Sequence, residues 1–478
     1  MNTYQQFING KFVDSHSKDW IEVENPYTGE IIAKVPQGDS EDGQAALEAA
    51  KKSQTAWAKK TPTERAGYLK QLAALIRANR VALAKLLASE QAKILPLAQV
   101  EIDVTAEYFD YYAGWARIFE GEVINSDDPN EHIFLYRKPI GVVAGICPWN
   151  FPFFVMARKV APSILTGCSI VLKPSSLTPL TTFEFAKLLA TLDLPAGVVN
   201  FVSGSGKTLG NTLTTSPLTD LVTVTGSVEA GQEIIHASAE NITKVSLELG
   251  GKAPAIVFAD ADLDFAVDRI AASRFIFSGQ VCNCAERAYV HKSVYNEFVD
   301  KFVAAAKATK IGDPFAEGVV YSTQVDKNQQ AKIADMVDRA VKAGAKVLTG
   351  GKKTTDNGKG YFYEPTVIVD AKQDSEIIQK EIFGPALPIL PFSDYDEVVA
   401  LANDCEYGLT SSAFTTNVNT ALRIIKDLKF GETYINREHF EAMQGFHAGW
   451  RKSGIGGADG KHGLMEYLAT QVAYIRTK

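Results

Sequence analysis

Cys282 is the residue whose type and sequence context most favour covalent chemistry, in the stretch FSGQVCNCAER at 277–287. A lone cysteine is usually a small buried hydrophobic residue. Here Ser278, Gly279 and Gln280 lead into it, and such a turn-forming entry exposes backbone N–H groups and lets a ligand approach closely. The sequence therefore favours Cys282 as a candidate nucleophile, with a buried structural thiol as the alternative.

A carboxylate upstream of this cysteine is the candidate base. Glu248 lies in LELGGKAP, at the end of an apolar run and just before a pair of glycines. Burying a carboxylate at the end of an apolar strand costs free energy unless the group is paired or has a function. A catalytic base and a salt-bridged structural glutamate both fit this pattern.

The glycine-rich stretch GSGKT at 204–208 does not meet either nucleotide-binding signature. Phe201 stands where a Walker loop needs its first glycine, and Leu209 stands where the dinucleotide fingerprint needs its third. The stretch is therefore expected to be a strand-to-helix turn near a possible phosphate. The chain contains neither G-x-S-x-G nor H-E-x-x-H, and its histidines and cysteines lack zinc-ligand spacing, so we expect no metal centre.

The elements that must position these residues belong to a long, ordinary globular chain. Its 478 residues suffice for about three domains, or for two large domains with an appendage. A net charge of −7 argues against nucleic acid or an anionic membrane as the main partner, and five scattered cysteines indicate a reducing compartment. The N-terminus lacks the layout of a signal peptide, and no apolar run approaches the roughly 20 residues of a membrane span. We therefore expect a soluble cytoplasmic protein.

The chain divides into segments with different hydrophobic periodicity. The first 20 or so residues predict short strands, residues from about 40 to 110 predict helices, and residues 119–138 predict a β-hairpin that needs a neighbouring chain or sheet. Apolar runs at 141–147, 169–174, 198–202, 221–225 and 254–258 alternate with helical stretches, which predicts a parallel doubly wound sheet. A second α/β series follows from about 260 to 436, and a last apolar strand is predicted at 471–476.

Six short motifs in register make the sequence resemble the aldehyde dehydrogenase superfamily. They are GQVC, LELGGKAP, PWNFP at 148–152, VLKPS at 171–175, TGS followed by Gly231, and EIFGP at 381–385. Each motif is weak alone, but together they are specific and span nearly the whole chain. The tail at 436–463 resembles bacterial members that act on lactaldehyde or glycolaldehyde.

The resemblance implies an α/β fold of two doubly wound domains plus a β oligomerisation element. The expected dinucleotide-binding domain is 1–118 with 139–247, the catalytic domain is 248–438, and the oligomerisation element is 119–138 with 455–478. Long unprotected β segments favour pairing with another subunit, so we expect a homodimer or homotetramer.

The resemblance also implies a reaction, the oxidation of a small aldehyde to a carboxylic acid. The Cys282 thiolate adds to the aldehyde and gives a thiohemiacetal, while the Asn150 amide and the Cys282 backbone N–H stabilise the oxyanion. Hydride transfer to NAD(P) leaves a thioester on Cys282, and Glu248 activates the water that hydrolyses it.

A larger set of residues is expected to bind the dinucleotide, with Lys173 and Glu381 on the ribose hydroxyls. The set comprises Ile146, Trp149, Lys173, Ser176, Gly206, Gly226, Ser227, Leu249, Glu381 and Phe383. One position departs from the family pattern, because NAD-preferring relatives commonly carry a glutamate where this chain has Ser176. Losing that carboxylate removes repulsion against a 2′-phosphate, so we expect NADP to be accepted as well as, or in preference to, NAD.

The resemblance further suggests a pocket for a 2-hydroxyaldehyde. Its polar residues are expected to be Arg158, Asn283, Glu441 and His447, with Phe153 and Phe440 as apolar walls. Ordinary packing of the aromatic residues and a surface charge at Arg158 are the alternatives. Cys284 is expected to be a buried spectator thiol, with a reversible bridge to Cys282 as the alternative.

Other functions remain open at this point. A CoA-acylating or a semialdehyde dehydrogenase shares most of these motifs, although relatives of the first kind tend to lack the water-activating glutamate that Glu248 supplies. A cofactor-independent esterase is disfavoured because no histidine is placed in the sequence as its base. An inactive binding relative is disfavoured by the intact set of Cys282, Glu248, Asn150 and Lys173.

Overall fold

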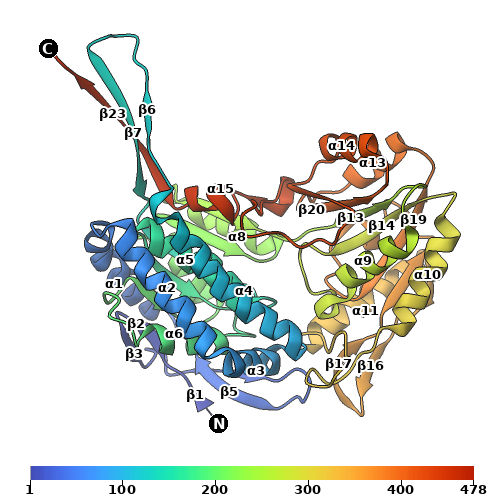
Figure 1. Ribbon diagram of the computed structural model, residues 1–478. Helices are drawn as coiled ribbons and strands as arrows, with labels where there is room; N and C mark the ends of the chain where they lie inside the picture. Colours follow the sequence, from blue (N-terminus) through green and yellow to red (C-terminus); the bar gives the residue numbers. More distant parts are fainter. Residues whose placement is uncertain (1) are drawn as a thin grey trace.

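A computed structural model describes residues 2–478, which form two α/β units and a projecting β arm (Figure 1). The sheet of the first unit has eight strands in the order β22-β12-β11-β8-β9-β10-β2-β3. Its strands are β2 (Gln6–Ile8), β3 (Lys11–Val13), β8 (Val142–Ile146), β9 (Ser169–Lys173), β10 (Val199–Phe201), β11 (Leu221–Thr225), β12 (Lys244–Glu248) and β22 (Gly454–Ile455). The strands from β8 to β12 are mutually parallel, and β9 is buried at every position, which explains its continuous apolar run.

Helices cover both faces of this sheet. They are α1 (Ser40–Ala58), α2 (Pro62–Ala78), α3 (Arg80–Gln91), α4 (Leu95–Gly114), α5 (Pro152–Thr166), α6 (Leu180–Leu189), α7 (Asn211–Thr215) and α8 (Val228–Ser238). Local sequence starts several of them: Asp39 caps α1, and Thr61 with Glu64 forms a capping box at α2. The helical periodicity expected between 40 and 110 is thereby confirmed. Helices α2, α4 and α5 pack against one another and build the largest core of the molecule.

The second unit has a seven-stranded sheet in the order β15-β18-β19-β14-β13-β20-β21. Its strands are β13 (Ala253–Val257), β14 (Ala285–His291), β15 (Lys346–Thr349), β18 (Thr366–Val369), β19 (Ala386–Phe392), β20 (Thr410–Phe414) and β21 (Glu432–Ile435). Its helices are α9 (Leu263–Phe275), α10 (Tyr295–Ala308), α11 (Lys327–Lys342), α12 (Glu376–Gln379), α13 (Tyr395–Asn403) and α14 (Val418–Asp427).

One strand lies in a different sheet from the one that the sequence suggested. The apolar run at 254–258 appeared to end the first series, but β13 pairs with β14 and β20 in the second sheet. The first sheet instead gains β12, whose strand precedes the Gly250–Gly251 turn. A continuous apolar run predicts a buried strand but carries no information on which of two sheets buries it.

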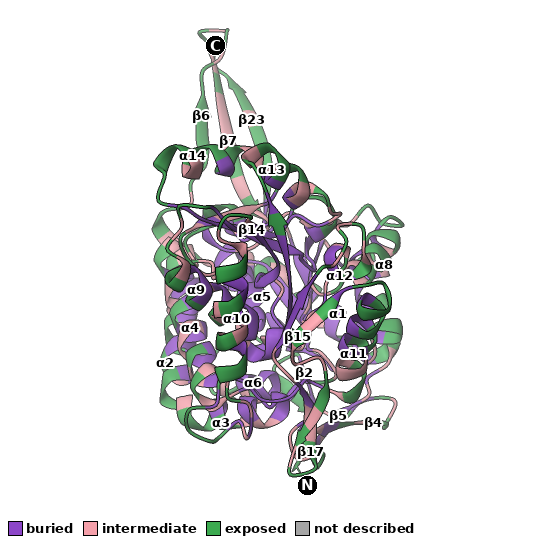
Figure 2. Cartoon of the chain, turned by 90° about the vertical axis from the view of Figure 1, so that its right-hand side faces the viewer, coloured by how far each residue is buried: buried purple, intermediate pink, exposed green. Residues whose placement is uncertain are grey.

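The arm is a three-stranded antiparallel sheet in the order β23-β7-β6. It consists of β6 (Glu122–Ile124), β7 (Glu131–Pro139) and β23 (Leu468–Arg476). The predicted hairpin and the predicted last strand are therefore confirmed. The last strand begins three residues earlier than expected. β23 pairs with β7 from Leu468 opposite Pro139 to Arg476 opposite Glu131. Figure 2 shows the arm as exposed or half-buried along most of its length, in contrast to the buried sheets.

The remaining strands and the last α-helix are small. They are β1 (Asn2–Thr3), β4 (Trp20–Glu24), β5 (Ile31–Pro36), β16 (Lys353–Asp356), β17 (Lys359–Tyr363) and α15 (Gly460–Met465). Within residues 2–478, no helix combines the length and the apolar character that crossing a membrane requires. The same residues contain no cluster of three or more histidine, cysteine, aspartate or glutamate side chains arranged to hold a metal ion.

Candidate active site

The carboxyl ends of four parallel strands in the first sheet meet at one edge. In the register of the sheet, Ile146 of β8 lies opposite Lys173 of β9 and opposite Val224 of β11, and Thr225 lies opposite Glu248 of β12. Open α/β sheets bind their ligands at this edge. This end of the sheet therefore brings together three residues that the sequence singled out: Ile146, Lys173 and Glu248.

A cavity of about 430 Å³ lies next to this edge and holds Cys282. Cys282 follows a short 3-10 turn (Ile276–Gly279) in which Phe277, Ser278 and Gly279 all adopt positive φ angles. This left-handed run costs backbone energy for the two residues that carry side chains, and such strain is typical of functional sites. The turn-forming sequence before Cys282 thus folds as a strained loop that presents the thiol to the cavity.

Most of the sequence-selected residues come together around this cavity. Its lining includes Cys282, Asn150, Asn283, Arg158, Phe440, Glu441 and His447. Phe153 does not line it, contrary to expectation. This ring is fully buried and packs edge to face against Phe185 at 6.0 Å, while Phe151 and Phe154 on either side of it face the cavity. The choice among three aromatic residues at the start of α5 depends on the rotation of the helix, which the sequence did not define.

Hydrogen bonds of both its side chain and its backbone fix the position of Asn150. Its side-chain amide donates to the carbonyl of Gln280 at 3.0 Å, which joins the α5 loop to the Cys282 loop. Its backbone carbonyl accepts hydrogen bonds from the buried side chains of Gln91 at 3.0 Å and Lys93 at 2.7 Å. Asn150 is therefore a preorganised amide beside the thiol.

Glu248 lies just behind the cavity. It is 5% exposed, and one of its carboxylate oxygens accepts a hydrogen bond from Thr225, which itself lines the cavity. The guanidinium of Arg158 is 3.9 Å from the same oxygen. Glu248 is thus a buried carboxylate with one hydrogen bond, to Thr225 of the cavity wall, and one cation at 3.9 Å.

Arg158 is the centre of a buried charge cluster that the sequence only partly predicted. Its Nη2 contacts Glu441 at 2.5 Å and Asp459 at 2.5 Å, and its Nε donates to Asp459 at 3.1 Å. Burial opposes ionisation of Glu441, but Arg158 and His447 outweigh it and lower the pKa of Glu441 to about 2. Burial raises the pKa of Asp459 to about 6 in spite of Arg158. Asn283 also donates to the Glu441 carboxylate.

Asp459 and Glu432 are site residues that the sequence reasoning missed. Asp459 precedes α15 with a φ of 71°, and it also accepts a hydrogen bond from Tyr108 at 2.8 Å. Glu432 begins β21 and contacts His447 at 2.5 Å. The glycine-rich tail signalled a turn near Asp459, but nothing local indicated its pairing with Arg158, three hundred residues earlier in the chain.

Comparison with known proteins settles the family. The model of the aldehyde dehydrogenase family matches residues 12–473. Lactaldehyde dehydrogenase of Escherichia coli K12 is 50% identical, with 99% of both chains covered, and a crystal structure of that enzyme superposes with a TM-score of 0.98 at the same identity and coverage. The chain belongs to the aldehyde dehydrogenase family.

Two further solved structures connect this aldehyde dehydrogenase to its cofactors. A 3,6-anhydro-L-galactose dehydrogenase in complex with NAP is 42% identical, covers 99% of this chain and 100% of its own, and has a TM-score of 0.97. A betaine aldehyde dehydrogenase from Staphylococcus aureus in complex with NAD⁺ is 34% identical, covers 99% of this chain and 95% of its own, and also has a TM-score of 0.97. The chain is thus an NAD(P)-dependent oxidoreductase with the expected fold of two α/β units.

The strand edge fits a dinucleotide on its own geometry. The Lys173 ammonium is buried, its one hydrogen bond within the described chain is to Pro174 O at 3.2 Å, and burial lowers its pKa to about 8. A Cβ atom built on Gly206 would meet open space, and one on Gly226 would touch its neighbours only at 3.9 Å or more. The Lys173 ammonium can therefore donate further hydrogen bonds, and the turns at Gly206 and Gly226 carry no side chain that would keep a ligand away from the backbone. Such an arrangement is suited to binding hydroxyl and phosphate oxygens.

The other residues expected to bind the cofactor lie around this edge. Ser176 Oγ donates to Gly204 O at 3.4 Å, in the turn that leads to Gly206. Ser227 caps α8. Leu249 packs so closely on α8 that a Cβ on Gly231 would lie 2.4 Å from its side chain. Trp149 and Phe383 meet edge to face at 5.3 Å, which brings a loop of each unit together.

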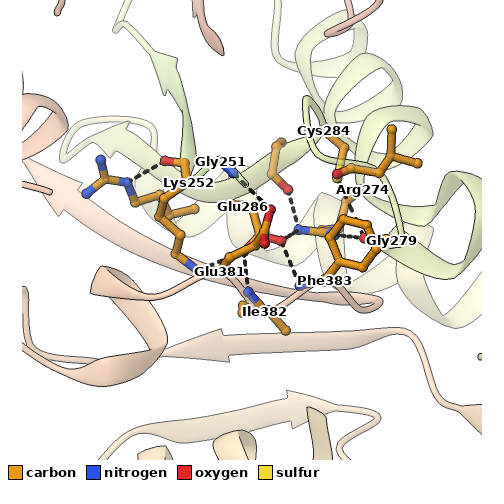
Figure 3. A network of polar contacts seen from close by, with 12 residues as sticks. Gly251, Lys252, Arg274, Gly279, Cys284, Glu286, Glu381, Ile382 and Phe383 are labelled. Carbon is orange, nitrogen blue, oxygen red and sulfur yellow. Dashed lines mark hydrogen bonds and ion pairs between the residues drawn. The ribbon is translucent and has the colours of Figure 1, made fainter. Parts of the chain in front are cut away.

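A buried ionic network ties the loop before Cys282 to the EIFGP segment (Figure 3). Glu286 accepts hydrogen bonds from Lys252 and Arg274 and from the backbone N–H groups of Ile382 and Phe383, at 2.7 to 3.1 Å. Arg274 in turn donates to Gly279 O in the strained turn at 2.5 Å. Glu286 thereby fixes Phe383, whose φ of 54° is left-handed.

Two further ionisable groups lie close to Cys282. Glu381 accepts the N–H of Gly251 at 2.9 Å, and burial raises its pKa to about 7. Cys284 is buried and its thiol donates to Val281 O at 2.9 Å. Burial also raises the pKa of Cys284 to about 12, which disfavours a thiolate there at neutral pH.

Proposed function

We propose that this aldehyde dehydrogenase oxidises a short 2-hydroxyaldehyde, such as lactaldehyde or glycolaldehyde, to the corresponding acid. The observation that carries the proposal is the polar set around Cys282. His447, Asn283 and the Arg158–Glu441 pair all face a cavity whose other walls are largely apolar. A hydroxyl on the carbon next to the aldehyde needs one donor and one acceptor close to the nucleophile, and this set offers both.

The charge balance of the cavity disfavours an aldehyde that carries a carboxylate, as a semialdehyde does. Arg158 is already neutralised by Glu441 and Asp459, with Glu248 only 3.9 Å away. The carboxylate of such a substrate would therefore approach these three carboxylates, and His447, which also lines the cavity, is already paired with Glu432. Desolvating it there costs more than the remaining attraction returns.

The reaction that we propose uses the residues in defined roles. Cys282 loses its S–H proton to solvent, and the thiolate sulfur then forms a bond to the aldehyde carbon. The electron pair of the C=O bond moves to oxygen, where the Asn150 amide and the Cys282 N–H donate to it. When bound, the dinucleotide supplies the hydride acceptor. Glu248 then takes a proton from water as that water attacks the Cys282 thioester, which restores the thiol and releases the acid. The presence of Glu248 also favours hydrolysis of the thioester over transfer of its acyl group to CoA.

Comparison of substrates tests the proposal directly. We expect kcat/KM for lactaldehyde or glycolaldehyde to exceed that for propanal by at least about 100-fold, because an apolar analogue leaves the buried polar groups unpaired. Succinic semialdehyde should also be a poor substrate. A higher kcat/KM for propanal than for both hydroxyaldehydes would refute the assignment of the pocket.

We further propose the division of labour between the parts of the chain. Residues 1–118 with 139–247 bind the dinucleotide and contribute Ile146, Trp149, Lys173, Ser176, Gly206, Gly226 and Ser227 to its site. Residues 248–438 carry the nucleophile and contribute Leu249, Glu381 and Phe383 to the same cofactor site. Because Ser176 presents neither negative charge nor bulk to a 2′-phosphate, its position near Lys173 supports the use of NADP as well as NAD. Five free thiols support work in a reducing compartment such as the cytoplasm.

The arm of β6, β7 and β23, which lies within the predicted oligomerisation element 119–138 with 455–478, is proposed to bind a second copy of this chain. Val123 and Tyr474 are 76% and 66% exposed on a three-stranded sheet that packs against no helix along most of its length. Such a sheet is only marginally stable alone and exposes unpaired strand edges. Light scattering should give the mass of a dimer or tetramer, and deletion of residues 470–478 should give monomers; a monomeric full-length chain would refute this.

A further inference from the structure

The cavity beside Cys282 is larger than the shortest hydroxyaldehydes require. Its volume is about 430 Å³. A water molecule occupies about 30 Å³ in the liquid, so the five non-hydrogen atoms of lactaldehyde need at most about 150 Å³. Ligand pockets generally enclose most of the surface of the ligand that they bind. Lactaldehyde leaves more than half of this cavity unfilled, so the side chains that line the remainder bear on which aldehydes fit.

The polar groups that the proposed function assigns to the 2-hydroxyl lie at the buried end of the cavity. Arg158, Asn283, His447 and Asp459 all line it, and each of them is at most 6% exposed. Carbon 1 of the substrate bonds to Cys282, and carbon 2 carries the hydroxyl that these groups bind. The first two carbons therefore occupy the buried end, and the rest of the carbon chain extends toward the more exposed part of the cavity.

This more exposed part is lined by apolar side chains from both α/β units, which we call the apolar mouth. Helix α4 contributes Leu97, Val100 and Val104, and spacings of three and four residues place them on one face of the helix. Leu97 and Val104 are half-buried, and Val100 is 53% exposed. The loop that follows β21 contributes Phe440 and Met443, which are also half-buried.

A polar substituent on the substrate would gain little at the apolar mouth. Glu101 also lines the cavity, but its carboxylate is already paired with Lys93 and accepts the backbone N–H groups of Phe153 and Phe154. The Gln444 side chain lies in a residue that is exposed to solvent. Burial of apolar surface is therefore the main source of affinity that this part of the cavity offers.

We propose that this enzyme also oxidises 2-hydroxyaldehydes whose apolar chain continues for several carbons beyond carbon 2, and that Leu97, Val100 and Val104 are specificity-determining residues for them. The proposal rests on the proposed function, because that function places the 2-hydroxyl at the buried end. The chemistry at carbon 1 is unchanged: aldehyde, water and oxidised dinucleotide give the acid, the reduced dinucleotide and one proton.

A series of racemic 2-hydroxyaldehydes of increasing length tests the proposal with the wild-type enzyme. The series runs from glycolaldehyde and lactaldehyde to 2-hydroxybutanal and 2-hydroxyhexanal, with kcat/KM measured from the absorbance at 340 nm. Each fully buried methylene contributes about fourfold. Because the mouth buries the chain only in part, we expect the three further carbons of 2-hydroxyhexanal to raise kcat/KM at least about tenfold over lactaldehyde. A gain of less than about threefold overturns the proposal.

An aspartate in the apolar mouth tests where the chain lies. Val100→Asp should reduce the gain from lactaldehyde to 2-hydroxyhexanal to less than about threefold, because the charge must lose water when the chain binds. The matched control is Val81→Asp on α3, which is 58% exposed and outside the cavity lining, and it should keep the wild-type gain. A wild-type gain in Val100→Asp would overturn the assignment of these residues. If Val100→Asp does not fold, as judged by its melting curve, the wild-type series decides.

Propanal and hexanal, measured beside their 2-hydroxy counterparts, separate this inference from the function on which it rests. A higher kcat/KM for propanal than for lactaldehyde refutes the 2-hydroxyaldehyde function, and this inference with it. A fall from lactaldehyde to 2-hydroxyhexanal, with lactaldehyde still ahead of propanal, overturns only the inference. The expected result is that each hydroxyaldehyde exceeds its matched aldehyde and that the longer hydroxyaldehyde exceeds the shorter.

Discussion

Removal of the Lys93 ammonium should damage both stability and catalysis. Lys93 is completely buried, contacts the Glu101 carboxylate, donates to Asn150 O at 2.7 Å, and lies 3.6 Å from the centre of the Phe151 ring. Lys93→Met leaves Glu101 charged and unpaired in the interior, which typically costs about 3–5 kcal/mol of unfolding free energy. It also leaves the Asn150 carbonyl with only the Gln91 donor, so the oxyanion-stabilising amide becomes less well placed.

The double variant Lys93→Met with Glu101→Gln separates these two effects. The neutral amide that the second substitution introduces keeps an oxygen for the N–H groups of Phe153 and Phe154, which Glu101 accepts at 3.0 and 3.2 Å, but it needs no cation. We expect most of the lost stability to return. The kcat should stay about ten- to a hundredfold low, because displacement of a catalytic group by about 1 Å costs up to this much.

Urea unfolding and steady-state kinetics measure the two quantities. The exposed pair of Arg80 with Asp103 is a matched control, and Arg80→Met should change neither of them measurably. An unfolding free energy of Lys93→Met within about 1 kcal/mol of the wild type would refute the buried-pair argument. Recovery of full kcat in the double variant would refute the positioning of Asn150.

Three further outcomes are expected. NAD and NADP should give kcat/KM values within about 100-fold of each other, or about 2.7 kcal/mol, and Ser176→Glu should reduce NADP use alone; a larger wild-type preference for NAD would contradict this. Asn150→Ala should lower kcat by about 100- to 1000-fold, whereas a loss below tenfold would exclude Asn150 from the oxyanion site. Burial lowers the pKa of His439 to about 3, so the unfolded chain binds a proton that the folded chain does not, and stability should fall with acidification below about pH 6.5, by up to about 1.4 kcal/mol per pH unit. His439→Gln should show a shallower loss in urea unfolding at pH 4 to 6, and an identical slope would contradict the assignment.

The sequence allowed prediction of the residues that local motifs mark. Cys282, Asn150 and Lys173 lie in turns or strand ends whose glycines, prolines and apolar runs define the backbone on both sides. Those motifs meet at one cavity and one sheet edge because parallel strands end on the same side. The continuous apolar runs likewise allowed the positions of the buried strands β8, β9 and β11 to be predicted.

The remaining features depend on contacts between distant parts of the chain. Asp459 and Glu432 have no local signal, because each becomes a site residue only through a partner on another element. The failure at Phe153 has a similar cause, since helix rotation is set by packing against Phe185. Likewise the sheet that contains β13 is chosen by its pairing with β14 and β20 rather than by its composition.

Direct observation of the acylated sulfur is the most decisive test of covalent catalysis. Glu248→Gln retains the cavity but lacks the base for hydrolysis, so mixing it with lactaldehyde and NADP or NAD should give one rapid burst of absorbance at 340 nm, about equal to the enzyme concentration. Mass spectrometry of the quenched protein should then find the acyl group on the peptide that contains Cys282. Steady turnover by Cys282→Ala, or a burst in Glu248→Gln with no acyl group on Cys282, would contradict the account.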